Sequence, residues 1–131
     1  MPKTITVVGA VFSSEEGVLA FRRNADRSAG GKWEFPGGKV EAHETPEEAL
    51  RREIFEELGL QITVGRLIDR SSTVVGENTI DLACYFVDAD EHPTQSSDHD
   101  QIVWQPFSAI RDLDWADPDV PAIEALLKVR K

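Results

Sequence analysis

The chain has 131 residues, of which 40% are hydrophobic and 29% charged, a balance typical of one globular domain over residues 1–131. Its formal net charge of −10 argues against binding of duplex nucleic acid, which requires a basic face. Cys84 is the only cysteine, so an internal disulfide is excluded, and its apolar neighbours predict a buried core thiol.

Residues 1–12 form a short apolar run without the length or cleavage site of a signal peptide, and no run approaches a membrane span. We therefore expect a cytoplasmic protein with no membrane attachment. Apolar runs bounded by turn-forming residues predict the strands. In chain order these are residues 4–12, 18–23, 33–35, 62–70, 72–75, 78–89 and 101–106. Residues 36–39, with the sequence PGGK, predict a strong break between elements.

The clearest helix follows this break. Thr45 is a good N-cap and Pro46 suits the first helical position. Glu48 completes a capping box with Thr45, and Gly59 is a natural C-cap. These signals predict a helix that begins after Thr45 and ends before Gly59.

Two further helices are expected, a short one at residues 108–113 and a C-terminal one at residues 120–131. The order of strands and helices predicts an α+β fold. We expect an α/β/α sandwich in which a mixed β-sheet lies between helices. The pattern leaves the strand order open.

The first helix carries an unusual cluster of acidic residues. Its apolar stripe consists of Leu50, Ile54 and Leu58. On the adjacent arc, Glu53 neighbours both Glu56 and Glu57, and each like-charge pair costs roughly 0.2–0.5 kcal/mol. Charge runs are usually solvated faces, which is one interpretation. The other is a bound divalent cation, with Mg²⁺ favoured, because clustered carboxylates suit a hard ion.

No second metal motif is found. Residues 88–99 begin like a calcium-binding loop, but Pro93 occupies the glycine position and His99 the closing acid position. We therefore interpret this stretch as a surface loop. His43, His92 and His99 lack metal-ligand spacing, and all three are expected at the surface.

Residues 38–60 resemble the Nudix box, G-x5-E-x7-R-E-U-x-E-E-x-G-U, in which U is aliphatic. Every fixed position is matched, by Gly38, Glu44, Arg52, Glu53, Ile54, Glu56, Glu57, Gly59 and Leu60. Residues 21–41, the Trp104 region and residues 112–126 look like the MutT-type branch of this family. The resemblance implies the Nudix α/β/α sandwich.

The resemblance also implies a chemistry. Nudix hydrolases cleave a nucleoside diphosphate linked to another group, and the MutT-type branch converts a nucleoside triphosphate to monophosphate and pyrophosphate. By position, Glu53, Glu56 and Glu57 would hold Mg²⁺, or alternatively Mn²⁺, together with the Gly38 carbonyl. Glu53 is also the first choice for activating the attacking water.

Supporting roles follow from the same match. Arg52 would orient the glutamates, and Glu44 would support the geometry of the loop and helix. Asp98 lies where the branch carries a supplementary metal ligand or base, six residues before Trp104. A solvated loop aspartate is the alternative for Asp98, and Asp100 offers a second register.

Four residues are candidates for binding the substrate. Arg23 would contact phosphate, although Arg22 could take that place, and Lys39 would assist or remain a surface lysine. Phe35 would pack beside the base or belong to the core. Asp119 matches a position that reads the base edge, with a helix N-cap as the alternative. Relatives specific for oxidised guanine have asparagine there, so aspartate favours CTP or dCTP over 8-oxo-dGTP.

The leading hypothesis is thus a Mg²⁺-dependent nucleoside triphosphate diphosphatase that sanitises the nucleotide pool, a monomer or homodimer. An ADP-ribose or dinucleotide hydrolase is the alternative within the family. Relatives that act on ADP-ribose often carry a proline past the box, and this chain has none between Pro46 and Pro93. Non-catalytic alternatives are a nucleotide-sensing Nudix module and a merely structural acidic helix.

Overall fold

The computed structural model describes residues 2–129, and its centre is a four-stranded mixed sheet in the order β4-β1-β6-β5. The central strand β1 (Thr4–Phe12) runs parallel to β6 (Asn78–Asp88) and antiparallel to β4 (Gly37–Lys39). The edge strand β5 (Thr63–Val75) pairs antiparallel with β6. The sheet is therefore mixed, as the sequence predicts.

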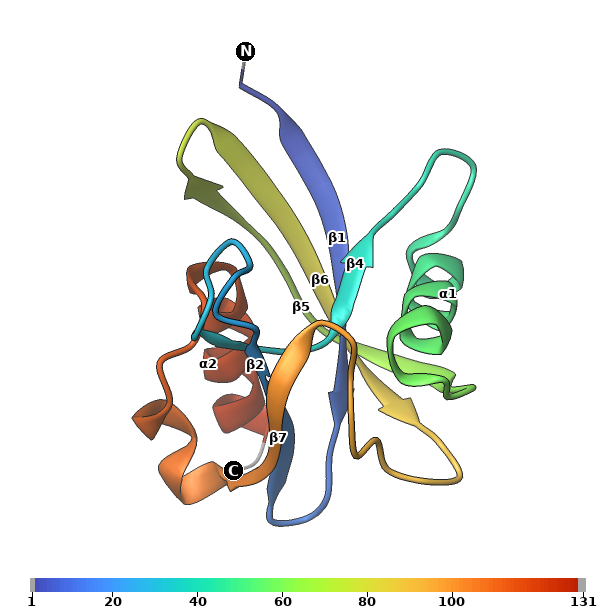
Figure 1. Cartoon of the computed structure of the whole chain (residues 1–131), viewed down its shortest axis with the longest axis vertical. Coiled ribbons are helices and arrows are strands. Elements are labelled where there is room, and N and C mark those ends of the chain that lie inside the picture. Colours follow the sequence, from blue (N-terminus) through green and yellow to red (C-terminus); the bar gives the residue numbers. More distant parts are fainter. Residues whose placement is uncertain (1, 130–131) are drawn as a thin grey trace.

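A second, three-stranded sheet has the order β3-β2-β7 and is antiparallel throughout. It comprises β3 (Trp33–Glu34), β2 (Gly17–Arg23) and β7 (His99–Pro106). Figure 1 shows the paired strands β2 and β7 beside the lower end of β1.

The two α-helices, α1 (Pro46–Leu58) and α2 (Val120–Val129), lie on opposite sides of the strands (Figure 1). Two 3₁₀ segments, η1 (Phe107–Asp112) and η2 (Asp117–Asp119), precede α2. The expected α/β/α sandwich is confirmed. Residues 130 and 131, the predicted end of the C-terminal helix, lie outside the described residues. No helix between residues 2 and 129 is both long enough and apolar enough to cross a membrane.

The core has two parts, one beneath each helix. In the first, the predicted stripe of α1 packs through Leu50 and Ile54, which are fully buried, with Leu58 partly buried beside them. In the second, Ile123 and Leu126 of α2 pack against Cys84, which is buried as expected.

Helix α1 begins and ends where its capping signals predict. The Thr45 hydroxyl accepts a hydrogen bond from the Glu48 N–H at 3.1 Å, and the Glu48 carboxylate accepts one from the Thr45 N–H at 2.9 Å. Gly59 ends the helix with φ of 69°, in the left-handed region that favours glycine.

We expect Thr45→Ala to lower the free energy of unfolding by about 1 kcal/mol, because it leaves the Glu48 N–H without its cap. Thermal unfolding would measure the loss. Glu47→Ala is the matched control, since Glu47 is exposed in the same turn and has no part in the capping box. An equal loss in both variants would contradict the capping argument.

The predicted and the observed strands differ mainly at three places. Residues 37–39 form β4 rather than only a break, because the glycine backbone lets the chain pair closely with β1. A Cβ on Gly37 would overlap the Val8 carbonyl oxygen, so the pairing requires glycine. The strands expected at 62–70 and 72–75 are one bulged strand, since pairing with β6 continues through Ser71 and Ser72. Strand β7 begins at His99 rather than at Gln101.

Candidate active site

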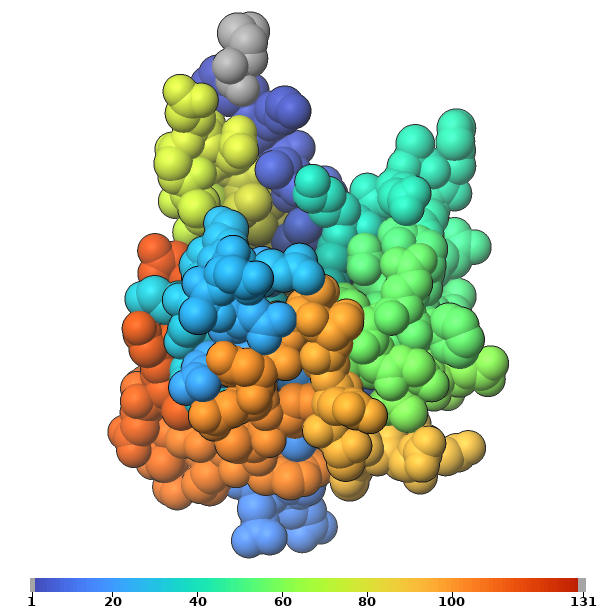
Figure 2. Space-filling model, in the orientation of Figure 1, coloured from blue at the N-terminus to red at the C-terminus, as the bar shows by residue number. Residues whose placement is uncertain are grey.

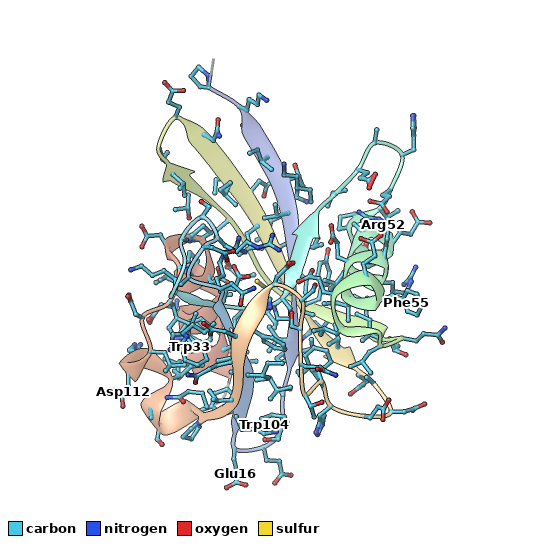
Figure 3. The ribbon with its side chains drawn as sticks, viewed as in Figure 1. Glu16, Trp33, Arg52, Phe55, Trp104 and Asp112 are labelled. Carbon is cyan, nitrogen blue, oxygen red and sulfur yellow. The ribbon has the colours of Figure 1, made fainter. Side chains whose placement is uncertain are left out.

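Arg52 ties the acidic face of α1 to the segment that precedes the helix. Its guanidinium donates two hydrogen bonds to Glu44, at 2.7 and 2.9 Å, and one to the Lys39 carbonyl at 3.0 Å. It also approaches Glu53 at 3.3 Å and Glu56 at 3.4 Å. Figure 3 labels Arg52 on α1, with Phe55 on the outer side of the helix. Hydrogen bonding to Arg52 lowers the pKa of Glu44 to about 2, so Glu44 holds Arg52 as a carboxylate.

Glu53 lies directly against β4. A Cβ on Gly38 would overlap the Glu53 carboxylate, so the missing side chain of Gly38 makes room for it. Burial raises the pKa of Glu53, against the opposing effect of Arg52. A glutamate with a raised pKa is a stronger base than an exposed one.

Glu57 is the most strongly perturbed acid on this face. Burial, together with the nearby charges of Asp98, Glu53 and Glu34, raises the pKa of Glu57 to about 9. Within residues 2–129, its buried Oε2 has no hydrogen-bond partner. A buried carboxylate oxygen without a donor calls for a cation or a proton.

These residues suit a hard divalent cation by their chemistry. They offer carboxylate oxygens on a rigid helix, a neighbouring backbone carbonyl and an unpartnered buried oxygen, the donor types that Mg²⁺ prefers. Among the described residues, no group of three or more acidic, histidine or cysteine side chains is already arranged to coordinate a metal ion. Arg52 draws the Glu53 and Glu56 carboxylates toward itself, and the like charges repel one another.

Asp98 approaches this cluster from the loop before β7. Its charge is one of the causes that raise the pKa of Glu57, and its carboxylate forms an ion pair with Arg27 at 2.7 Å. Asp100 instead pairs with Arg22 at 2.8 Å, and both side chains are partly exposed. The sequence left open whether Asp98 or Asp100 lies near the glutamates, and in the structure it is Asp98.

A cavity of about 370 Å³ adjoins the cluster. Its lining includes Gly38, Arg23, Phe35 and Asp119. In Figure 2, loop 24–32 lies in front of the upper strands, and a notch separates those strands from the segment before α1. Lys39 does not line the cavity, whereas Lys32, a loop residue without any motif in the sequence, does.

Arg23, rather than Arg22, faces this cavity. Its guanidinium donates to Glu34 at 3.1 Å and to the Ser28 carbonyl at 2.7 Å. Arg22 lies over the Trp33 ring, 6.0 Å from its centroid. Adjacent strand residues point to opposite faces, which explains the division between the two arginines.

Phe35 and Asp119 meet at the buried end of the cavity. Phe35 is only 4% exposed and packs on Trp115, with ring centroids 5.0 Å apart. The Asp119 carboxylate accepts a hydrogen bond from the Phe35 N–H at 3.0 Å, which links η2 to the strand segment instead of capping α2. Burial, with a smaller contribution from Glu34, raises the pKa of Asp119 well above its usual value.

The surface assignment of His99 was wrong, whereas His43 and His92 are exposed as expected. His99 is 6% exposed, and its Nε2 lies 2.8 Å from Glu34 Oε2. Sequence reasoning also missed Glu34. Both residues are recognised only through long-range contacts, because the ring reaches across β2 to an acid 65 positions away.

Comparisons with known proteins identify the family of the chain. The NUDIX domain model matches residues 2–126. The CTP pyrophosphohydrolase of Escherichia coli (strain K12) is 37% identical over 130 residues, covering 98% of this chain and 95% of that protein. The 8-oxo-dGTP diphosphatase of Proteus vulgaris is 38% identical over 79 residues, covering 60% of this chain and 70% of that protein. The MutT protein of Methanosarcina mazei Go1 shares the fold with a TM-score of 0.87, at 22% identity over 99% and 97% of the two chains. The chain therefore belongs to the Nudix family and is a Nudix hydrolase.

Proposed function

We propose that the chain hydrolyses nucleoside triphosphates to the monophosphate and pyrophosphate with Mg²⁺, for which Mn²⁺ can substitute. The proposal rests mainly on Gly38, where the cavity and the acidic face of α1 meet. This glycine lines the cavity, and its missing side chain makes room for the Glu53 carboxylate. A nucleotide in the cavity would therefore present its phosphates to the acidic face of α1.

The roles of the acidic residues follow from their positions. Glu53, Glu56 and Glu57 would hold the cation with the Gly38 carbonyl and Asp98, and the bound cation would neutralise phosphate charge. Glu53 would accept the proton of the attacking water, a task that its raised pKa favours. Arg52 would keep the carboxylates oriented, and Glu44 would hold Arg52.

The substrate contacts would divide along the cavity. Arg23 would bind phosphate or sugar oxygens, and Lys39 would act from the surface beside the cavity. Phe35 and Asp119 would meet the base. Aspartate in place of asparagine favours CTP or dCTP, in agreement with the relative named CTP pyrophosphohydrolase. 8-oxo-dGTP is the second substrate to test, since another relative bears that name. We propose a cytoplasmic setting and action as a monomer or homodimer in nucleotide-pool sanitation.

A panel of nucleotides tests the function. Purified protein with Mg²⁺ would be given CTP, dCTP, 8-oxo-dGTP and ADP-ribose, and the products would be separated by chromatography. We expect pyrophosphate and a nucleoside monophosphate from the cytidine nucleotides. Faster cleavage of ADP-ribose would favour the alternative hydrolase, and tight binding without any turnover would favour a nucleotide sensor.

We expect Asp119→Asn to lower kcat/KM for CTP by roughly 10- to 100-fold. The ratio of kcat/KM for 8-oxo-dGTP to kcat/KM for CTP should rise. The physical reason is the change of hydrogen-bonding groups at the buried end of the cavity. Asp117→Asn is the matched control, since Asp117 also lines the cavity but is exposed. An unchanged ratio of the two substrates in Asp119→Asn would exclude a base-reading role.

A further inference from the structure

His99 stands in a continuous line of hydrogen bonds that the proposed mechanism does not use. Its Nε2 lies 2.8 Å from Glu34 Oε2, and its Nδ1 lies 2.7 Å from Ser96 Oγ. Ser96 Oγ in turn accepts a hydrogen bond from the Asp98 N–H at 3.3 Å. The line therefore runs from Glu34, through the buried ring, to the backbone of Asp98.

The strand register places His99 and Glu34 close together. On β2, Phe21 pairs with Glu34 of β3, and a register shift between Arg22 and Arg23 pairs Arg23 with His99 of β7. Paired residues point to the same face of a sheet, and Phe21 and Arg23 share one face because they are two positions apart. His99 and Glu34 therefore meet over β2, with the His99 ring 5.2 Å from the Phe21 ring.

The partners assign the direction of each hydrogen bond. Glu34 Oε2 accepts from Arg23 Nη1 at 3.1 Å, and this carboxylate also accepts from His99 Nε2–H. The other ring nitrogen then accepts from the Ser96 hydroxyl. The hydroxyl keeps a lone pair for the Asp98 N–H. With a proton on Nε2, every polar group of the line has a partner.

We propose that Glu34, His99 and Ser96 form a positioning relay that holds Asp98 against Glu57 and links it to Arg23 in the cavity. The inference rests on the proposed function, because it gives Asp98 a part in binding the cation. Asp98 has two further contacts: its carbonyl accepts a hydrogen bond from the Asn24 N–H at 3.1 Å, and its carboxylate pairs with Arg27 at 2.7 Å. Its ion-pair partner Arg27 has a side chain 47% exposed, so that pair is solvent-screened.

A purely structural histidine would explain the burial but predicts a different response to mutation. His99→Phe keeps an aromatic ring against Phe21 and removes both hydrogen bonds. If His99 acts through Asp98, the effects of His99→Phe and Asp98→Asn on the cation will not add. Independent residues give additive effects, whereas residues of one network do not.

The experiment compares wild type, His99→Phe, Asp98→Asn and the double variant. Mg²⁺ binding would be measured by titration calorimetry, with kcat and the Mg²⁺ concentration for half-maximal activity as kinetic readouts. We expect each single variant to weaken Mg²⁺ binding about tenfold, and the double variant to match Asp98→Asn. Exchange of the amide hydrogens at residues 96–98 should accelerate in His99→Phe. His92→Phe, at an exposed histidine, should change none of these quantities.

Two further variants keep the inference testable. Ser96→Ala removes the hydroxyl that links His99 to the Asp98 N–H and leaves the histidine itself in place. It should therefore weaken Mg²⁺ binding, and this test remains available if His99→Phe does not fold. His99→Asn should recover part of the loss, because its amide oxygen can accept from Ser96 where Nδ1 did. Additive losses in the double variant, or unchanged amide exchange at residues 96–98, would overturn the relay. Failure of the nucleotide panel with a non-additive effect on Mg²⁺ binding would instead refute the proposed function alone.

Discussion

Glu57→Gln should stabilise the metal-free protein while it abolishes most activity. Glu57 is largely buried beside Asp98, Glu53 and Glu34, which together with burial raise its pKa from 4.5 to about 9. The neutral amide has the same shape and removes the like-charge repulsion. Because the same carboxylate is a proposed cation ligand, we expect kcat to fall by roughly 10- to 100-fold or more.

The stability gain should depend on pH in a defined direction. The folded protein binds the Glu57 proton more tightly than the unfolded chain, so wild-type stability is full below about pH 4.5 and falls as the pH rises toward 9. Glutamine does not titrate, so Glu57→Gln escapes this loss. We expect a gain on the order of 1–3 kcal/mol near pH 8 that shrinks toward pH 4.5.

Thermal unfolding in a chelating buffer across this pH range would measure the effect. Glu56→Gln is the control for stability, because Glu56 is exposed on the same helix and removing its charge relieves no buried repulsion. Added Mg²⁺ should stabilise wild type and have little effect on Glu57→Gln. A variant less stable than wild type at pH 8 would contradict the repulsion that we infer around Glu57.

The features that the sequence predicted well are those with local causes. The ends of α1 follow from Thr45, Glu48 and Gly59, whose capping contacts all lie within a few residues. The buried stripe of Leu50 and Ile54 follows from helical periodicity. The spacing of the box glutamates places them on one helix face for the same reason. Local rules therefore located the acidic face without any knowledge of the strand order.

The features that the sequence missed depend on contacts between distant segments. His99 looked like a loop residue because its environment comes from Glu34 and Phe21, which belong to other strands. The candidate substrate-binding residues were identified by resemblance alone. The structure shows that Arg23 lines the cavity and that Lys39 does not. Alternation along β2 places Arg22 and Arg23 on opposite faces, but the sequence does not show which face lies toward the cavity until the strands are paired.

The glycines of β4 show how one short segment serves both the fold and the site. Gly37 and Gly38 are adjacent, and a Cβ on either would collide with a different group. On Gly37 it would overlap the Val8 carbonyl oxygen, which belongs to the backbone of the central strand. On Gly38 it would overlap the Glu53 carboxylate, the far end of a flexible side chain. The two substitutions should therefore fail in different ways.

We expect Gly37→Ala to lower the free energy of unfolding by about 1–3 kcal/mol, because the backbone of β1 has no low-energy way to move aside. Gly38→Ala should keep most of the wild-type stability, since Glu53 can rotate away. Its kcat should fall by roughly 100-fold, because the displaced carboxylate is the proposed base. Denaturant unfolding and steady-state kinetics on both variants would separate the two outcomes.

A double variant decides whether Gly38 acts through Glu53. In a Glu53→Gln background, which removes the proposed base, Gly38→Ala should cause little further loss of kcat, because both changes disable one group. Losses that multiply would mean that Gly38 serves the reaction independently of Glu53, for example through its carbonyl. Wild-type turnover in Gly38→Ala would contradict the close approach of Glu53 to β4 and, with it, the placement of the proposed base beside the cavity.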